Sequence, residues 1–232
     1  LYVCESCAPT SIAFDGDGNL WFTAQNDRAA YFMNPPYEHP SGSVILAWGW
    51  PTEIQALPGS PRMIVGMRDA NEFAVIETRE SKFARQILGP SPSQLMLKPG
   101  DDAVWVFADV LGAVGRMAAF GDGERSNWEA YEGAPTVFDG AFAYEGSLYL
   151  QSSRKRNRLI LSDADEHKLV KFIEHDEAVG VVAADPRGMR FAVALPNSER
   201  VGIFAIGEDG DITLESAFEV QGAVNQLLWL AH

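Results

Sequence analysis

Cysteine, positive charge and long apolar runs are all scarce in this chain of 232 residues. Two cysteines exclude a fold built on many disulfides. Eighteen lysines and arginines stand against 32 acidic residues, so the formal charge is −14 and the chain repels phosphate backbones and anionic membrane surfaces. The longest apolar runs, such as residues 179–184, are far shorter than the roughly 18 residues of a membrane span. We therefore expect neither a nucleic-acid partner nor a membrane span.

The composition nevertheless supports a sizeable core, with 47% hydrophobic and 22% charged residues. All-β domains often reach this length as one unit, and we predict a single domain over residues 1–232. The chain starts at Leu1 and shows no charged and apolar leader, which fits a mature exported protein and a trimmed one equally. The cellular compartment therefore stays open.

One local pattern recurs five times: an apolar run, a polar turn usually with Gly or Asp, and a second run that opens with an aromatic residue. The first copy covers residues 11–14, 15–19 and 20–22. The aromatic residues are Trp21, Phe73, Trp105, Tyr149 and Phe191, spaced by 52, 32, 44 and 42 residues. The long first interval contains residues 34–40, whose prolines cannot supply ladder hydrogen bonds, so we interpret it as an insertion in a surface loop. The other intervals centre near the length of a β-propeller blade.

A polar turn follows each aromatic run and leads to further strands. Asn and Ser, which tolerate tight-turn geometry, recur in these turns, for example at Asn157, and the turn at residues 80–82 leads to a strand at Phe83. Residues 224–230 match the first strand of a sixth repeat and would place Trp229 in a core. The sequence therefore predicts an all-β fold, a β-propeller of about five four-stranded blades plus a partial closing blade. The alternative is a fragment of a larger propeller.

Two stretches carry a resemblance to known propellers. Residues 18–23 (Gly-Asn-Leu-Trp-Phe-Thr) followed by residues 26–28 (Asn-Asp-Arg) look like the blade signature of streptogramin lyases. Residues 197–204 together with residues 209–214 resemble a blade of the lactonase propellers. The chain is thus similar to the streptogramin-lyase, NHL-repeat and gluconolactonase-like group. The resemblance implies a propeller fold, and a metal-assisted lyase or lactonase as one function.

The sequence departs from that group where its catalysis lies. In streptogramin lyases a Glu closes the Trp-Phe-Thr strand, and His and Glu nearby hold or assist a metal. Here Ala24 follows Thr23, and no His lies near residues 9–11. No catalytic residue can therefore be carried over to this chain.

Metal and cofactor sites lack the usual spacing. The four histidines are His39, His167, His175 and His232, and no two of them form an H-x-H, H-x-x-x-H or H-E-x-x-H pair. Cys4 and Cys7 would supply half of a zinc site, and a local disulfide is the simpler interpretation. Residues 15–19 resemble the start of a calcium loop but lack its later Gly and Glu. We predict no metal and no cofactor.

No nucleophile motif of the G-x-S-x-G type occurs, and 32 acidic residues supply carboxylate pairs by chance alone. We therefore assign no catalytic residue, and enzyme activity stays open.

Two surfaces remain as candidates for binding. The first is the basic turn of Arg154, Lys155, Arg156 and Arg158, which is either a solvated turn or a contact for an acidic partner or a phosphate.

The second candidate surface contains Trp48 and Trp50, just beyond the proline-rich loop of Tyr37. Exposed Trp is a frequent anchor of protein interfaces and sugar sites, although a core position is the more usual one for a Trp. The sequence thus favours a non-catalytic binding or scaffold module that acts through its rim loops. We expect a protein partner, with a small molecule or sugar as the alternative ligand. The alternative function is the lyase or lactonase implied by the resemblance.

Overall fold

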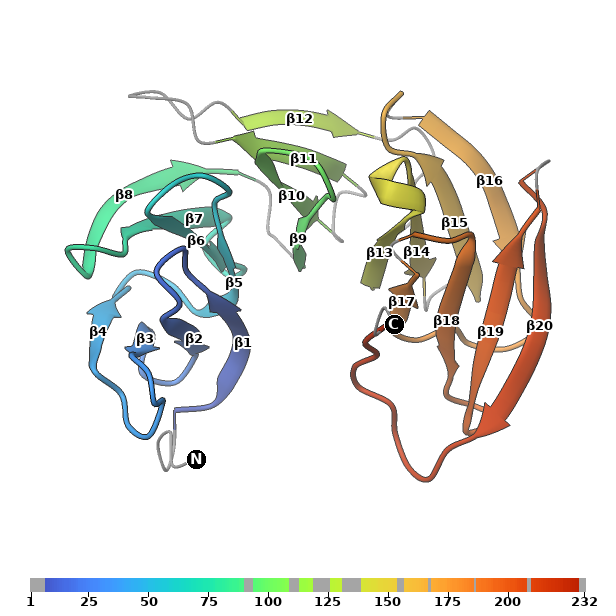
Figure 1. The fold of residues 1–232 in the computed structure, drawn as a ribbon, viewed down its shortest axis with the longest axis horizontal. Helices are drawn as coiled ribbons and strands as arrows, with labels where there is room; N and C mark the ends of the chain where they lie inside the picture. Colours follow the sequence, from blue (N-terminus) through green and yellow to red (C-terminus); the bar gives the residue numbers. More distant parts are fainter. Residues whose placement is uncertain are drawn as a thin grey trace. The chain divides into compact units, whose positions relative to one another are not determined.

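The structure is a computed structural model that describes residues 7–89, 94–108, 113–118, 126–130, 139–153, 157–166, 168–185, 187–207 and 210–229. Within these ranges the chain forms twenty β-strands and one short 3-10 helix, Tyr144–Gly146. The strands make five antiparallel sheets, each of four strands that are consecutive in the chain (Figure 1). In the described part of the chain no helix has the length and apolar character needed to cross a membrane.

Each sheet is a meander in which neighbours in sequence are neighbours in space. The first sheet contains β1 (Pro9–Phe14), β2 (Leu20–Ala24), β3 (Ala29–Met33) and β4 (Gly42–Ile45). The second contains β5 (Pro51–Ala56), β6 (Arg62–Met67), β7 (Glu72–Glu77) and β8 (Lys82–Leu88). The third contains β9 (Gln94–Leu97), β10 (Ala103–Ala108), β11 (Ala113–Ala118) and β12 (Ser126–Ala130). The fourth contains β13 (Asp139–Ala143), β14 (Leu148–Ser153), β15 (Arg158–Asp163) and β16 (Lys168–Glu174). The fifth contains β17 (Val182–Ala184), β18 (Arg190–Leu195), β19 (Arg200–Ile206) and β20 (Ile212–Glu219).

The chain divides into two compact units, one with the first two sheets and most of the third, the other with the fourth and fifth sheets. In the first unit, one face of the first sheet packs on the second sheet. Trp21 and Phe32, on paired strands, stack with ring centroids 4.9 Å apart, and they lie against Ile54 and Met63 of the second sheet. Gly42 is opposite Phe32 in register, and a Cβ there would lie 2.5 Å from the Phe32 ring. Glycine therefore lets the ring lie flat on the sheet.

The second sheet is buried on both of its faces. On β6, Met63 faces the first sheet, whereas Ile64 packs with Val104 and Val106 of the third sheet. A strand covered on both faces needs apolar residues at successive positions, because neither side chain direction reaches water. This explains why β6 and β7 read as continuous apolar runs without alternation.

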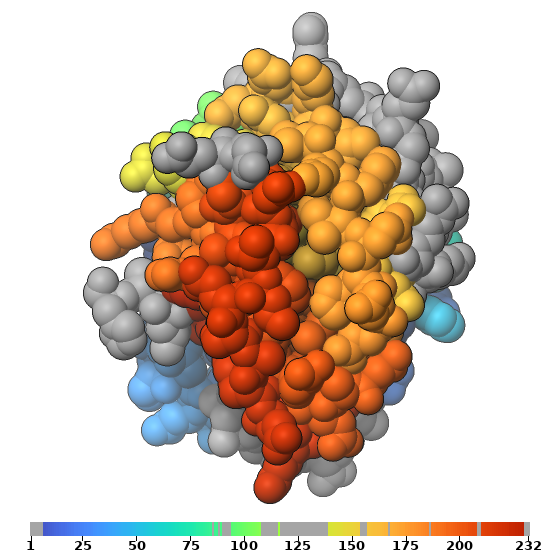
Figure 2. Space-filling view, turned by 90° about the vertical axis from the view of Figure 1, so that its right-hand side faces the viewer, coloured from blue at the N-terminus to red at the C-terminus, as the bar shows by residue number. Residues whose placement is uncertain are grey.

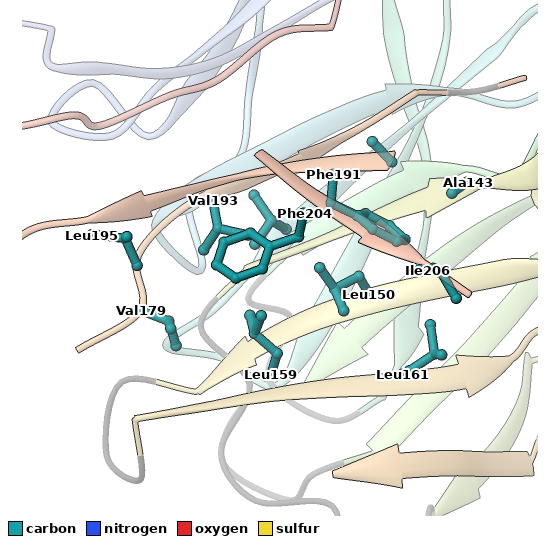
Figure 3. Close-up of a cluster of buried hydrophobic side chains, with 12 residues drawn as sticks. Ala143, Leu150, Leu159, Leu161, Val179, Phe191, Val193, Leu195, Phe204 and Ile206 are labelled. Carbon is teal, nitrogen blue, oxygen red and sulfur yellow. The ribbon is translucent and has the colours of Figure 1, made fainter. Parts of the chain in front are cut away.

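The second unit is held by a core between its two sheets. Figure 3 shows Leu150 and Leu159 of the fourth sheet facing Phe191 and Phe204 of the fifth. Both sheets end in an exposed edge strand, and Figure 2 shows residues of β20 (red) beside residues of β16 (orange). An ion pair between Lys171 and Asp211 links these two segments. Exposed charge on outer strands discourages unwanted pairing with other sheets.

The repeat predicted from the sequence is correct in four of its five copies. Trp21, Trp105, Tyr149 and Phe191 lie on second strands and are at most 1% exposed. Phe73 is equally buried, but it lies on β7, the third strand of its sheet. The second-strand position of that sheet is occupied by Met63 of β6, which is fully buried. With Met63 the spacings become 42, 42, 44 and 42 residues.

This register removes the predicted insertion. The loop at residues 34–41 joins β3 to β4 on the surface, as expected, but it does not lengthen the repeat. The predicted register of the second sheet was wrong because the polar turn at residues 68–71 resembles a turn between first and second strands. It joins the second strand, β6, to the third strand, β7. The true first strand, β5, begins with Pro51 and alternates with polar residues. For the same reason Phe83 lies on a fourth strand, β8, and the prediction of a third strand there is wrong.

The segment after β20 does not form the strand predicted at residues 224–230. The structure assigns no strand within residues 221–229, and Trp229 is partly exposed. A strand needs a neighbour that supplies its ladder of hydrogen bonds. None of the described strands pairs with this segment. The predicted counterpart at Leu1 lies outside the described residues.

Candidate functional site

The turn between β1 and β2 is closed by a single carboxylate. Asp15 Oδ1 accepts hydrogen bonds from the backbone N–H groups of Asp17 and Asn19, both at 2.9 Å. Asp15 Oδ2 accepts from Asn19 Nδ2 at 3.0 Å and from Trp21 Nε1 at 2.8 Å. Burial alone would raise the pKa of Asp15, but these hydrogen bonds outweigh it and hold the pKa below its usual value. The carboxylate is therefore ionised and its acceptor sites are occupied, which is a structural role.

The third sheet has an equivalent carboxylate, Asp101, which accepts a hydrogen bond from a buried indole and also pairs with an arginine. Asp101 Oδ2 accepts from Trp105 Nε1 and from Arg116 Nε, each at 3.0 Å, and Arg116 also reaches Asp102 at 2.8 Å. Burial acts to raise the pKa of Asp101, yet the hydrogen bonds from Arg116 and Trp105 and the charge of Arg116 hold it far below the usual range. Such a carboxylate cannot take up a proton near neutral pH, so it is no general acid or base.

We expect the Asp101–Arg116 pair to stabilise the fold at neutral pH and to fail in acid. Because the folded pKa is depressed, the contribution is complete above the unfolded value of about 3.9 and falls as the pH drops towards the folded value. Asp101→Asn should cost about 1–3 kcal/mol at pH 7 and flatten the loss of stability below about pH 4. Urea unfolding at pH 7, 4 and 2 measures both effects.

Asp211→Asn is the matched control, because the Lys171–Asp211 pair is exposed and contributes about 0–1 kcal/mol. An acid response of Asp101→Asn equal to that of the unsubstituted protein would contradict the assignment.

The connection between β4 and β5 carries an exposed aromatic surface. Trp48 is 36% exposed, Trp50 is 48% exposed and Phe83 of β8 is 36% exposed. The Trp48 and Phe83 rings meet edge to face with centroids 4.6 Å apart. These three residues are called the aromatic patch below. The structure thus places the two predicted tryptophans at the surface and adds Phe83 to them.

The backbone beneath the aromatic patch is held at several points. The Trp50 N–H donates to Asp69 Oδ1 at 2.7 Å, and Arg28 Nη1 donates to the Ala47 carbonyl at 3.1 Å. Gly49 is buried, and a Cβ on it would lie 3.0 Å from the Met67 side chain. A glycine between the two tryptophans lets the chain lie close to the turn between β6 and β7. The indoles are therefore presented by a fixed backbone.

Tyr37 serves the fold of the first sheet. Its hydroxyl donates to the Gly18 carbonyl at 2.7 Å, and its ring meets Phe14 edge to face at 5.9 Å. It packs with Leu20 on the face of the first sheet that points away from the second. Tyr37 is half-buried there, so only part of its ring is available to a partner.

In the basic turn, Arg158 makes two contacts within its own sheet. It forms an ion pair with Glu174, and its guanidinium lies over the Phe172 ring at 4.6 Å from the centroid. Its side chain is only 16% exposed. Arg154, Lys155 and Arg156 lie outside the described residues, so their role as partner contacts stays a prediction.

The side chains considered as metal donors in the sequence are not gathered in the described part of the chain. No three of His, Cys, Asp and Glu come together at one point among those residues. Cys7 is disulfide-bonded, whereas Cys4, His167 and His232 lie outside the described ranges. His175 has Nδ1 3.3 Å from the backbone nitrogen of Glu177, which is a local turn contact.

Comparison with known proteins identifies the fold. No family model and no curated protein matches the chain. Among solved structures, virginiamycin B lyase from Staphylococcus aureus has a TM-score of 0.72 at 14% identity, over 95% of this chain and 72% of that one. The RRP9 WD40 repeats have a TM-score of 0.74 at 12% identity, over 94% and 68%. The Cps50 (Swd1) β-propeller domain of Myceliophthora thermophila has a TM-score of 0.69 at 12% identity, over 94% and 73%.

The chain folds as a β-propeller. The predicted fold class and the structural resemblance to the streptogramin-lyase group are thereby confirmed, and five four-stranded sheets are compatible with the predicted number of blades. Identities of 12–14% establish the fold and carry no activity to this propeller. The part that sequence reasoning missed is Phe83, because its contact with Trp48 joins segments 35 residues apart and leaves no local pattern.

Proposed function

We propose that this propeller is a non-catalytic binding module, and that the aromatic patch of Trp48, Trp50 and Phe83 is its contact surface. The observation that carries the proposal is the exposure of two indoles on a backbone held by Asp69, Arg28 and the buried Gly49. A backbone that is already held in place loses little conformational entropy on binding. Trp is also the residue type most enriched among binding hot spots.

A protein with an apolar pocket surrounded by basic residues is the partner that fits best. The indoles supply large apolar area for such a pocket. The formal charge of −14 gives the whole chain a negative field, which accelerates encounter with a basic surface. A sugar stacked on an indole is the alternative ligand, and it is separated from a protein by testing oligosaccharides in the same binding assay.

In the part of the chain that the structure describes, we find no residue that favours the lyase or lactonase alternative. Ala24 closes β2 where the streptogramin lyases carry a Glu, and it is fully buried. A methyl group can neither move a proton nor hold a metal. The similarity to virginiamycin B lyase supports the fold of this chain and leaves its chemistry open.

We expect Trp50→Ala to weaken partner binding by at least about thirtyfold, the loss typical of a hot-spot residue. Trp48→Ala should weaken it by about tenfold, because part of that ring already packs on Phe83. The partner is first captured from cells with the unsubstituted chain, then purified, and its Kd is measured calorimetrically against each variant. Melting temperatures should change by only a few degrees, since both indoles are exposed.

Leu228→Ala is the matched control, because Leu228 is 79% exposed and lies in the other unit of the chain. It should leave the Kd unchanged. If both tryptophan variants bind the purified partner as tightly as the unsubstituted chain, the aromatic patch is not the contact surface.

A further inference from the structure

A cavity of about 350 Å³ lies in the first unit of the chain. It is formed by the β1–β2, β5–β6 and β7–β8 turns. Phe14, Leu57, Pro58 and Pro61 supply its apolar lining. The volume is at the lower end of the roughly 300–1,000 Å³ found for small-molecule sites.

Two mostly exposed charged groups of opposite sign line this cavity and form a long ion pair. Arg79 Nε lies 4.0 Å from Asp17 Oδ2, which is beyond hydrogen-bond distance. Among the described residues, neither the Arg79 guanidinium nor the Asp17 carboxylate takes part in a hydrogen bond. A donor and an acceptor thus stand side by side at the opening of the cavity.

The third charged group of the lining is already occupied. Asp15 accepts four hydrogen bonds from its own turn and from Trp21, so it offers nothing to a ligand. Its role is to fix the β1–β2 turn from which Asp17 projects. The chemistry of the cavity therefore rests on Asp17, Arg79 and the apolar lining.

We propose that this cavity binds a free α-amino acid with a large apolar side chain, such as phenylalanine or leucine. An α-amino acid carries its carboxylate and its ammonium on one carbon, which matches the adjacent Arg79 and Asp17. The guanidinium fork pairs with carboxylates, and the Asp17 carboxylate accepts from an ammonium group. The apolar side chain packs against the prolines of the β5–β6 turn.

Charge argues for a zwitterion over a simple ion. A net charge of −14 repels a plain organic anion from Arg79. A plain organic cation is repelled by Arg79 itself. A zwitterion carries no net charge and satisfies both groups. The site is separate from the aromatic patch, so it is independent of the proposed function.

A series of phenylalanine analogues tests the site on the intact, unsubstituted chain. Calorimetry or ligand-observed NMR compares L-phenylalanine with 3-phenylpropionate, which lacks the ammonium, and with 2-phenylethylamine, which lacks the carboxylate. Each analogue should bind about tenfold more weakly than phenylalanine, the loss expected for one charged hydrogen-bonding contact. Glycine, which lacks the apolar side chain, should show no binding at the same concentrations.

Two substitutions assign each charge to its partner. Arg79→Gln should make phenylalanine and 2-phenylethylamine bind equally, and Asp17→Asn should do so for phenylalanine and 3-phenylpropionate. Arg187→Gln is the control, because Arg187 is exposed and outside the cavity. Trp50→Ala should leave phenylalanine binding unchanged. The proposal is overturned if phenylalanine does not bind at millimolar concentration, or if the unsubstituted chain binds all three aromatic ligands equally.

Discussion

Replacing Trp21 by alanine should lower the free energy of unfolding by about 3–5 kcal/mol, the range for removing a buried aromatic side chain. Trp21 is fully buried between the first and second sheets, where it stacks on Phe32 and packs against Met63. The substitution leaves a cavity and also removes the Nε1–H that donates to Asp15. For a chain of this length the melting temperature should fall by about 6–20 °C.

Trp21→Phe separates the two contributions. It keeps most of the apolar volume and removes only the hydrogen bond to Asp15, so a loss of about 1–3 kcal/mol is expected. Guanidinium unfolding followed by circular dichroism measures both variants. If Trp21→Ala costs less than 1 kcal/mol, the second-strand position is not a core position and the repeat register is incorrect.

The second large effect is expected in the other unit. Phe191 is fully buried and packs with Leu150 and Phe204 in the core between the fourth and fifth sheets (Figure 3). Phe191→Ala should therefore also cost about 3–5 kcal/mol. Because we propose that residues 1–232 are one domain, Phe191→Ala and Trp21→Ala should each move the same single unfolding transition.

Differential scanning calorimetry distinguishes one domain from two. A single transition in the unsubstituted chain, shifted to lower temperature by either substitution, is the expected result. Two transitions, with Trp21→Ala moving only one of them and Phe191→Ala moving only the other, would show that the two units fold independently.

The strand repeat could be predicted from the sequence because each repeat depends on residues close together in the chain, such as those of its turns. Asn71 and Asn157 have positive φ angles immediately before third strands, and Asn is a residue type that favours this conformation. Arg28 and Glu199 have positive φ angles at the same position, but their residue types do not predict such a turn. The prediction failed where a residue type was taken as the marker of a position. The second-strand position of the second sheet requires a large buried apolar side chain, and Met63 meets that requirement as well as an aromatic residue does.

The candidate surface was predictable in part. Trp48 and Trp50 were named because they lie just beyond a proline-rich loop and because exposed Trp often anchors interfaces. Their exposure was not predictable, because it depends on Gly49 packing against the β6–β7 turn and on Asp69 binding the Trp50 N–H. The same holds for Asp17 and Arg79, which are 62 residues apart and meet only because two sheets pack together.

Photo-cross-linking at two exposed positions tests the binding surface most directly. A benzoylphenylalanine residue is placed at position 47 in one protein and at position 228 in another, replacing Ala47, which is exposed beside Trp48, and Leu228, which is 79% exposed. Both tryptophans are thereby kept, and each protein is irradiated with the purified partner. The account predicts a cross-linked product from position 47 and none from position 228. A product from position 228 alone, or equal yields from both positions, would contradict the aromatic patch as the contact surface of this propeller.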